Sequence, residues 1–148
     1  MSKISSKIYV GDSSTARNRQ FFIDNDIRAV LNCTTDINNY YPVLAEYMRI
    51  PIEDSLLKKD IDLFFKYIPV CAAFIHKHVD IQKQNVYIHC WEGKQRSTAA
   101  LVSYYCIYKN KTLKEARASI SSKRKEAFNY NKHVNFAPAL ERYFAQKI

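Results

Sequence analysis

The sequence lacks any stretch that approaches the roughly 20 apolar residues a membrane helix needs, and residues 1–11 contain no apolar secretory segment. We therefore expect a protein of the cytoplasm or nucleus. The four cysteines form no CxxC pair and no metal-ligand spacing, which excludes a small disulfide framework and favours reduced thiols. Glycine is also scarce: only two occur in the chain, so the place of each needs a physical reason.

What the sequence does contain is typical of one globular domain. Its 148 residues are 47% hydrophobic and 25% charged, which suffices for a sizeable core and argues against a disordered or fibrous chain. The 23 Lys and Arg outnumber the 14 Asp and Glu, and the formal charge is +9. This balance favours anionic partners, namely phosphoproteins, phosphoinositides, nucleic acid or an acidic membrane surface, without choosing among them.

Short apolar runs alternate with helical patterns, which predicts an α/β fold. Four runs rich in β-branched and aromatic residues are predicted strands: Lys7–Gly11, Arg28–Cys33, Met48–Ile52 and Asn85–His89. The last of these is almost wholly apolar, as expected for a central strand.

Helical spacing of apolar residues predicts five helices, at about Ser13–Asn25, Asp60–Val79, Arg96–Lys109, Thr112–Lys125 and Phe136–Gln146. We expect Ser13 or Ser14 to cap the first, Pro69 to kink the second and Thr112 to cap the fourth. The third is apolar nearly all round, which predicts a buried helix. The basic run at 123–125 is predicted to be a solvated helix end, stabilised by the helix dipole.

The strongest functional signal is the segment His89–Ser97, which joins the predicted central strand to the buried helix and contains Gly93. A cysteine and an arginine spaced like Cys90 and Arg96 recur by chance in roughly one such chain in five. Requiring the flanking His, Gly and Ser as well lowers that expectation to on the order of 10⁻⁵. The combination therefore indicates a function.

The chemistry of such a segment follows from its place between a strand and a helix. Backbone N–H groups that curl toward one point, together with the positive end of the helix dipole, form a nest for a phosphate dianion. A thiol at its base, Cys90, is favoured as a nucleophilic thiolate. Arg96 has the planar fork needed to hold two phosphate oxygens, and Ser97 is placed to donate a hydrogen bond to the sulfur.

The segment resembles the HCxxGxxR[S/T] signature of cysteine-based protein phosphatases, in particular the small (atypical) dual-specificity phosphatases. Segments typical of that family follow in its order along nearly the whole chain: Ile8–Gly11, Ala29–Asn32, Ile50–Asp54, Phe64–Phe65, Phe74–Ile75, the signature itself, and Ala99, Leu101, Val102, Tyr104 and Tyr105. The resemblance implies one dual-specificity phosphatase catalytic domain over residues 1–148. Its fold would be a central, mostly parallel sheet flanked by helices.

The resemblance also implies a reaction without metal or cofactor. The enzyme would remove phosphate from phosphotyrosine and phosphoserine or phosphothreonine of proteins, with Cys90 as nucleophile and Asp54 as general acid. Glu53 is the rival acid, since only one of two neighbouring residues of a strand should face the pocket. If neither acts, the proton would come from water or from Asp60 or Asp62 on the following helix. The residues expected to bind substrate are Trp91, Glu92, Gly93, Lys94, Gln95 and Arg96, with His89 orienting the loop.

The sequence departs from the family pattern near the signature and near its end. Gln95 stands where Ser is usual, Trp91 and Glu92 stand where smaller residues are frequent, and a Pro-Asn-x-x-Phe motif is reduced to His133–Phe136. Cys33 lies one residue away from a position where tensin-type phosphatases carry a cysteine that forms a disulfide with the nucleophile.

Three alternatives to a protein substrate or an enzyme stay open at the level of sequence. Lys94 occupies a position where lipid-cleaving relatives carry a basic residue, so a phosphoinositide phosphatase is one alternative, and an RNA 5′-phosphatase on the same loop is another. An inactive phosphate-binding module is the alternative of another class, although such modules usually lack the Cys or the Arg.

Overall fold

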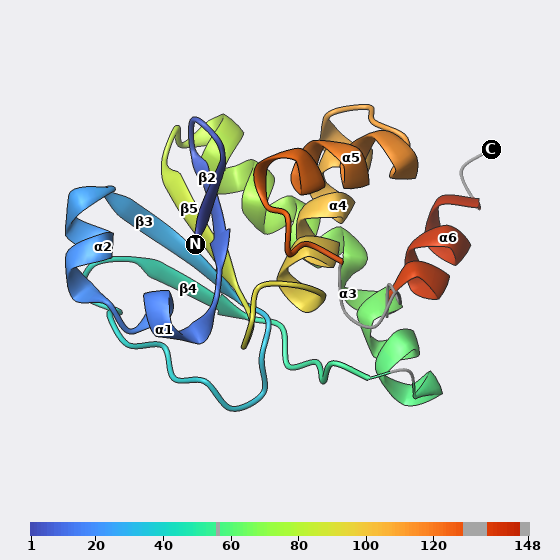
Figure 1. Cartoon of the computed structure of the whole chain (residues 1–148), viewed down its shortest axis with the longest axis horizontal. Helices are drawn as coiled ribbons and strands as arrows, with labels where there is room; N and C mark the ends of the chain where they lie inside the picture. Colours follow the sequence, from blue (N-terminus) through green and yellow to red (C-terminus); the bar gives the residue numbers. More distant parts are fainter. Residues whose placement is uncertain (56, 129–135, 146–148) are drawn as a thin grey trace.

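The computed structural model describes residues 1–55, 57–128 and 136–145. Its centre is a five-stranded sheet in the order β1-β2-β5-β3-β4 (Figure 1). The strands are β1 (Ser2–Ser5), β2 (Ile8–Gly11), β3 (Ile27–Asn32), β4 (Glu46–Arg49) and β5 (Asn85–His89). All neighbours pair in parallel except β1, which is antiparallel to β2. The predicted α/β fold with a mostly parallel sheet and central β5 is thus confirmed.

The helices lie on both faces of the sheet (Figure 1). They are α1 (Ser13–Ala16), α2 (Arg19–Asp24), α3 (Lys58–His76), the π-helical turn η1 (Lys77–Ile81), α4 (Arg96–Tyr108), α5 (Leu113–Lys123) and α6 (Ala137–Ala145). The predictions of α4 and of its burial are confirmed. Helix α3 continues through Pro69, and the kink expected at this proline stays a prediction. Gln146, the last residue of the fifth predicted helix, lies outside the described residues.

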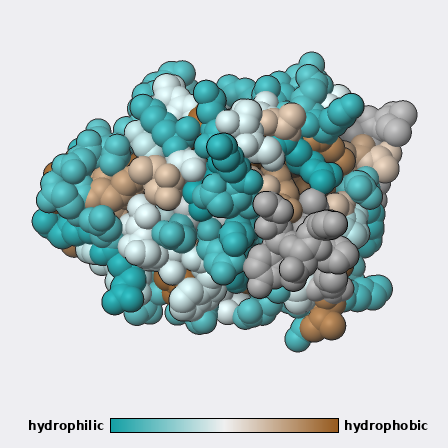
Figure 2. Space-filling model, in the orientation of Figure 1, coloured by the Kyte–Doolittle hydropathy of each residue, from teal (hydrophilic) through white to brown (hydrophobic). Residues whose placement is uncertain are grey.

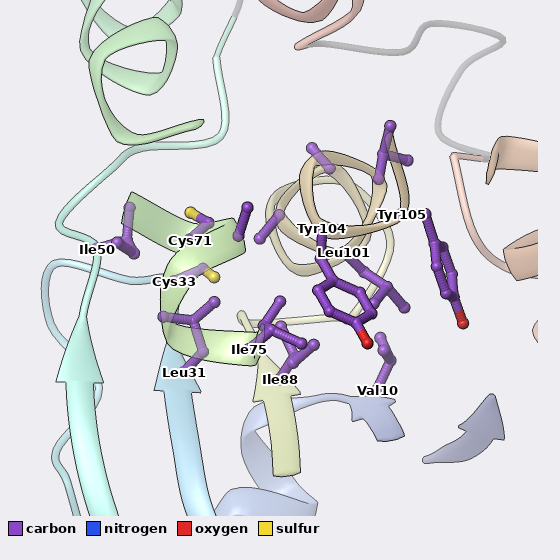
Figure 3. Close-up of a cluster of buried hydrophobic side chains, with 14 of the residues drawn as sticks. Val10, Leu31, Cys33, Ile50, Cys71, Ile75, Ile88, Leu101, Tyr104 and Tyr105 are labelled. Atoms are coloured by element: carbon purple, nitrogen blue, oxygen red, sulfur yellow. The ribbon is translucent and has the colours of Figure 1, made fainter. Parts of the chain in front are cut away.

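Two cores sandwich the sheet because its side chains alternate between the faces. On one face Tyr9, Val30 and Tyr87 pack against Phe21 and Phe22 of α2. The larger core lies on the other face, where strand residues meet α3 and α4 (Figure 3). Residues labelled there that belong to this core include Val10, Leu31, Cys33, Ile75, Ile88 and Leu101. This double burial fixes the carboxyl ends of β2, β5 and β3 side by side.

The single helix predicted at Ser13–Asn25 is in fact two helices, α1 and α2. Asn18, in extended conformation, accepts a hydrogen bond from the Phe21 N–H (3.2 Å) and begins α2 as its N-cap. Asp12 caps α1 by accepting from the Thr15 N–H (2.9 Å), so the prediction that Ser13 or Ser14 is the cap was wrong. Thr112, by contrast, caps α5 as predicted, within a capping box.

The strand predicted at Met48–Ile52 begins and ends earlier, at Glu46–Arg49. Ile50 still donates to the Asn32 carbonyl (2.8 Å), but Pro51 has no N–H to continue the ladder. The Ile52 N–H then bonds the Ile50 carbonyl (2.9 Å), a tight turn typical of strand ends. This turn directs the residues that follow toward the carboxyl end of β5.

Strand β1 was not predicted, because its sequence, Ser-Lys-Ile-Ser, holds a single apolar residue. It forms the sheet edge beside β2.

The face shown in Figure 2 is mainly hydrophilic, with separate apolar patches. In the part of the chain that the structure describes, no helix is long and apolar enough to cross a membrane.

Candidate active site

The segment between β5 and α4 forms a tight loop with Cys90 at its base. The Cys90 sulfur is nearly buried, at 3% exposure of the residue. It accepts a hydrogen bond from the Gly93 N–H (Sγ to N 3.2 Å) and lies 3.3 Å from the Ser97 hydroxyl oxygen. Both predicted neighbours of the sulfur, the loop backbone and Ser97, therefore contact it. Donors in these positions stabilise a thiolate.

The loop requires glycine at position 93, whose φ of +70° lies in the left-handed region. A Cβ there would lie 2.6 Å from the carbonyl oxygen of Gly11, at the end of β2. The backbone of Gly11 thus leaves no room for a side chain at position 93, whereas a Cβ at Gly11 itself would lie 2.6 Å from the Tyr87 hydroxyl oxygen.

Arg96 opens α4 and is 5% exposed. Its Nη1 donates to the Ile52 carbonyl oxygen (3.0 Å), which ties the arginine to the turn that precedes Asp54. Within the described residues its Nε has no hydrogen-bond partner. The N-cap residue Gln95 makes no side-chain hydrogen bond to the first N–H groups of α4. A buried guanidinium and an uncapped helix N-terminus beside one thiol make an anion site.

Asp54 lies in the same pocket as the thiol. The pocket, of about 330 Å³, is lined by Asp54, Cys90, Trp91, Glu92, Lys94, Gln95 and Arg96. Glu53 instead accepts a hydrogen bond from the Thr35 hydroxyl (2.6 Å). Asp60 accepts from Ser55 (2.5 Å), and Asp62 bonds Lys58 (2.7 Å). Of the four carboxyls considered from the sequence, Asp54 is the one that lines the pocket.

Three residues that line the pocket depart from the family pattern, and two of them, Trp91 and Glu92, are exposed. The Trp91 indole, 49% exposed, donates its Nε1–H to Asp36 (3.0 Å). Lys94 and Glu92 form an ion pair with 3.6 Å between Nζ and Oε2. Gln95 is buried, at 2% exposure. Of the seven residues that line the pocket, four are charged and one is the thiol Cys90, while the Trp91 indole supplies an apolar edge.

His89 supports the loop from beneath. It is fully buried, its ring stacks on Tyr87 (centroids 5.6 Å apart), and its Nδ1 lies 3.4 Å from the Cys90 carbonyl oxygen. Burial lowers the pKa of His89 from 6.5 to about 4, so the ring is neutral at physiological pH. A neutral imidazole that donates to a loop carbonyl is consistent with the predicted orienting role.

The other thiols have different surroundings. Cys33 and Cys71 are fully buried in the larger core (Figure 3). Burial raises the pKa of both thiols, to about 12 for Cys71. In the described ranges of the chain, no group of three or more His, Cys, Asp or Glu residues has the arrangement of a metal site.

Arg124 was predicted to be solvated at a helix end, and this prediction was wrong: the side chain is buried against the loop. Arg124 is 4% exposed and donates from Nε to the Gly93 carbonyl (2.8 Å) and from Nη2 to the Glu92 carbonyl (3.1 Å). Lys123 and Lys125 are exposed, as predicted. The inward turn of Arg124 had no signal in the sequence, because its partners are main-chain carbonyls about 30 residues away.

The sequence matches the family model described as the dual specificity phosphatase catalytic domain over residues 8–143. It is 25% identical over 124 residues to dual specificity protein phosphatase 18 of Rattus norvegicus and 27% identical over 124 residues to dual specificity protein phosphatase 14 of Homo sapiens. It is 28% identical over 144 residues to protein phosphatase Slingshot of Drosophila melanogaster.

These three alignments cover 84%, 84% and 95% of this chain, but 58%, 60% and 13% of the relatives. The chain therefore spans less than two thirds of their length.

Solved structures share the fold. Human DUSP28 has a TM-score of 0.83 at 16% identity, covering 99% of this chain and 97% of that one. The human tyrosine phosphatase-like serine/threonine/tyrosine-interacting protein has the same TM-score and coverage at 20% identity.

Proposed function

Since the chain belongs to the dual-specificity phosphatase family, we propose that it hydrolyses phosphomonoesters of phosphotyrosine and of phosphoserine or phosphothreonine in proteins. The observation that carries the proposal is the convergence of Cys90, Arg96 and Asp54 on one small pocket at the start of α4. Modules that only bind phosphate have no need for a thiol that accepts a hydrogen bond from the Gly93 N–H and contacts the Ser97 hydroxyl at the base of the nest.

In the first step the Cys90 thiolate attacks phosphorus in line with the leaving oxygen. The S–P bond forms as the P–O bond breaks, and Asp54 donates its proton to the departing oxygen. Arg96 and the loop N–H groups stabilise the charge on the equatorial oxygens, since they are fixed before the reaction begins. The products of this step are the dephosphorylated hydroxyl and a cysteinyl phosphate.

In the second step water attacks phosphorus while the Asp54 carboxylate accepts its proton. The S–P bond breaks and its electron pair returns to sulfur, which regenerates the thiolate. Hydrogen bonds to Cys90 Sγ from the Gly93 N–H and the Ser97 hydroxyl stabilise this leaving group. Inorganic phosphate leaves with the site restored to its initial state.

Two observations favour phosphoproteins over substrates with additional charge. The pocket volume of about 330 Å³ is near the lower end of the range for ligand sites, and a single phosphorylated side chain suits it. The basic residue that would read a second phosphate, Lys94, is paired with Glu92. A phosphoinositide or RNA 5′ end is therefore the second candidate.

A location in the cytoplasm or nucleus stays a prediction from the sequence.

The test is turnover of an aryl phosphate by the wild type and by Cys90→Ser, with Cys106→Ser as a matched thiol-to-hydroxyl control outside the pocket. We expect Cys90→Ser to retain less than about a hundredth of the activity and still bind tungstate as a phosphate analogue, because the hydroxyl is a far weaker nucleophile in the same nest. Cys106→Ser should be fully active.

Two results would contradict the proposal. Activity that survives in Cys90→Ser would require another nucleophile. A wild type that binds tungstate without turnover of any phosphoester would be a binding module. Released phosphate from phosphotyrosine peptide, phosphothreonine peptide, phosphoinositide vesicles and 5′-triphosphate RNA, measured side by side, then separates the substrate classes.

A further inference from the structure

Arg124 lies directly behind the phosphate loop. It follows α5 as the C-cap residue, where the chain turns back toward the centre of the molecule (Figure 1). Its guanidinium is held at all three nitrogens: Nε and Nη2 bond the Gly93 and Glu92 carbonyls, and Nη1 bonds the Ser2 hydroxyl (3.0 Å). Nη1 also lies 3.4 Å from a carboxyl oxygen of Glu126, whose side chain is half exposed.

A second bond reaches the same side of the loop from the same segment. The Phe128 N–H donates to the Lys94 carbonyl (2.8 Å). Three successive carbonyls, those of residues 92, 93 and 94, therefore accept hydrogen bonds from the segment 124–128, which we call the rear clamp.

The rear clamp determines where the loop N–H groups point. A trans peptide unit is planar, with its C=O and its N–H on opposite sides. In the peptide between Glu92 and Gly93, the oxygen accepts from Arg124 and the N–H donates to the Cys90 sulfur. The same geometry turns the N–H groups of Lys94 and Gln95 away from the clamp. Holding the carbonyls behind the loop thus presents its N–H groups in front.

The charge of Arg124 strengthens this arrangement. A guanidinium on a carbonyl oxygen polarises the peptide, which makes its N–H a stronger donor. The planar fork reaches two adjacent carbonyls at once, a geometry that a lysine ammonium does not supply. Because the guanidinium is 4% exposed, water does not screen this effect strongly.

We propose that Arg124 is a positioning residue for the phosphate loop, which acts on Cys90 through the peptide between Glu92 and Gly93. The proposal deepens the proposed function and rests on it for its effect on turnover. Its effect on the thiol does not depend on that function, because the thiolate is stabilised whether or not a phosphoester is the substrate.

The test measures the rate of Cys90 alkylation by iodoacetamide as a function of pH, resolved by peptide mass spectrometry. The variants are Arg124→Met and Arg124→Lys, with Lys123→Met and Lys125→Met as controls that remove an exposed positive charge on either side. We expect the pH midpoint of alkylation to rise by about one unit or more in Arg124→Met and less in Arg124→Lys. Both controls should keep the wild-type midpoint.

Circular dichroism at each pH identifies variants that are folded. If Arg124→Met is unfolded, Arg124→Lys decides the question, since it keeps the charge and most of the volume. A folded Arg124→Met with the wild-type midpoint would overturn the proposal, even if its kcat/KM falls, and so would a folded Arg124→Lys with that midpoint where Arg124→Met is unfolded. A shifted midpoint in a protein without turnover would support the positioning role and contradict the proposed function, so the two failures are distinguishable.

Discussion

Buried, neutral His89 makes the stability of this domain depend on pH. Its pKa is lowered to about 4 in the fold, whereas an unfolded chain has the ordinary value of 6.5. Above pH 6.5 neither state is protonated and His89 contributes no pH dependence. As the pH falls below 6.5 the unfolded chain binds the proton first, so stability is lost between pH 6.5 and about 4 and levels off below.

The size of the loss follows from the shift. One pKa unit corresponds to 1.36 kcal/mol, so the full loss is about 3 kcal/mol and the loss at pH 5 is about 2 kcal/mol. Since His89 is fully buried, solvent screening does not reduce these values appreciably. For a domain of this size the loss at pH 5 corresponds to about 4–8 °C in Tm.

The assay is thermal unfolding at pH 7.5 and pH 5.0 for the wild type and for His89→Asn, followed by circular dichroism. Carboxyls with a lowered pKa, such as Asp80 beside His76 and Lys109, also lose stability in acid, but they do so in both proteins. The fall in Tm between the two pH values should therefore be about 4–8 °C larger in the wild type. An equal fall in both proteins would refute the assignment of a buried neutral imidazole.

Three further predictions concern the loop and its substrate. Gly93→Ala should lower the free energy of unfolding, measured by denaturant titration, by about 2–5 kcal/mol, of which about 1–2 kcal/mol comes from the left-handed backbone and about 1–3 kcal/mol from the contact with Gly11; a variant of wild-type stability would contradict the described loop. Asp54→Asn should cost roughly 10²–10⁴ in kcat/KM on ordinary phosphoesters and much less on an activated aryl phosphate, while Glu53→Gln changes little; the reverse pattern would make Glu53 the acid. If the second candidate function holds and Lys94 reads additional substrate charge, Lys94→Ala should weaken activity on phosphoinositides or RNA ends more than on a small aryl phosphate, by a difference that shrinks with salt; equal effects would leave Lys94 as a general loop charge and favour phosphoproteins.

The sequence was sufficient where local pattern and function coincide. Strand β5, the loop and helix α4 follow one another without a gap, and the apolar run, the glycine and the arginine each had a local reason. The pocket also contains Asp54, which the resemblance had singled out. Its catalytic role stays a prediction.

The features that were missed depend on hydrogen bonds to groups outside the local pattern. Asn18 splits a continuous helical pattern because its side chain competes for a backbone N–H. Strand β1 has little apolar content and is held by pairing with β2. Arg124 looked like part of a charged helix end, and only the tertiary fold brings it to carbonyls of residues 92 and 93.

The rear clamp also predicts an order of events during folding. The Gly93 carbonyl of the loop is bonded to Arg124, which lies 31 positions later in the chain, and Arg124 is bonded to Ser2, which lies 122 positions before Arg124. Contacts of such sequence separation form late, after local structure. We therefore expect a nascent or truncated chain that already carries Cys90 and Arg96 to lack the inward-facing N–H groups until α5 has docked. In a refolding experiment, the reactive thiol should return after the helical signal, as a reporter of the last stage of assembly.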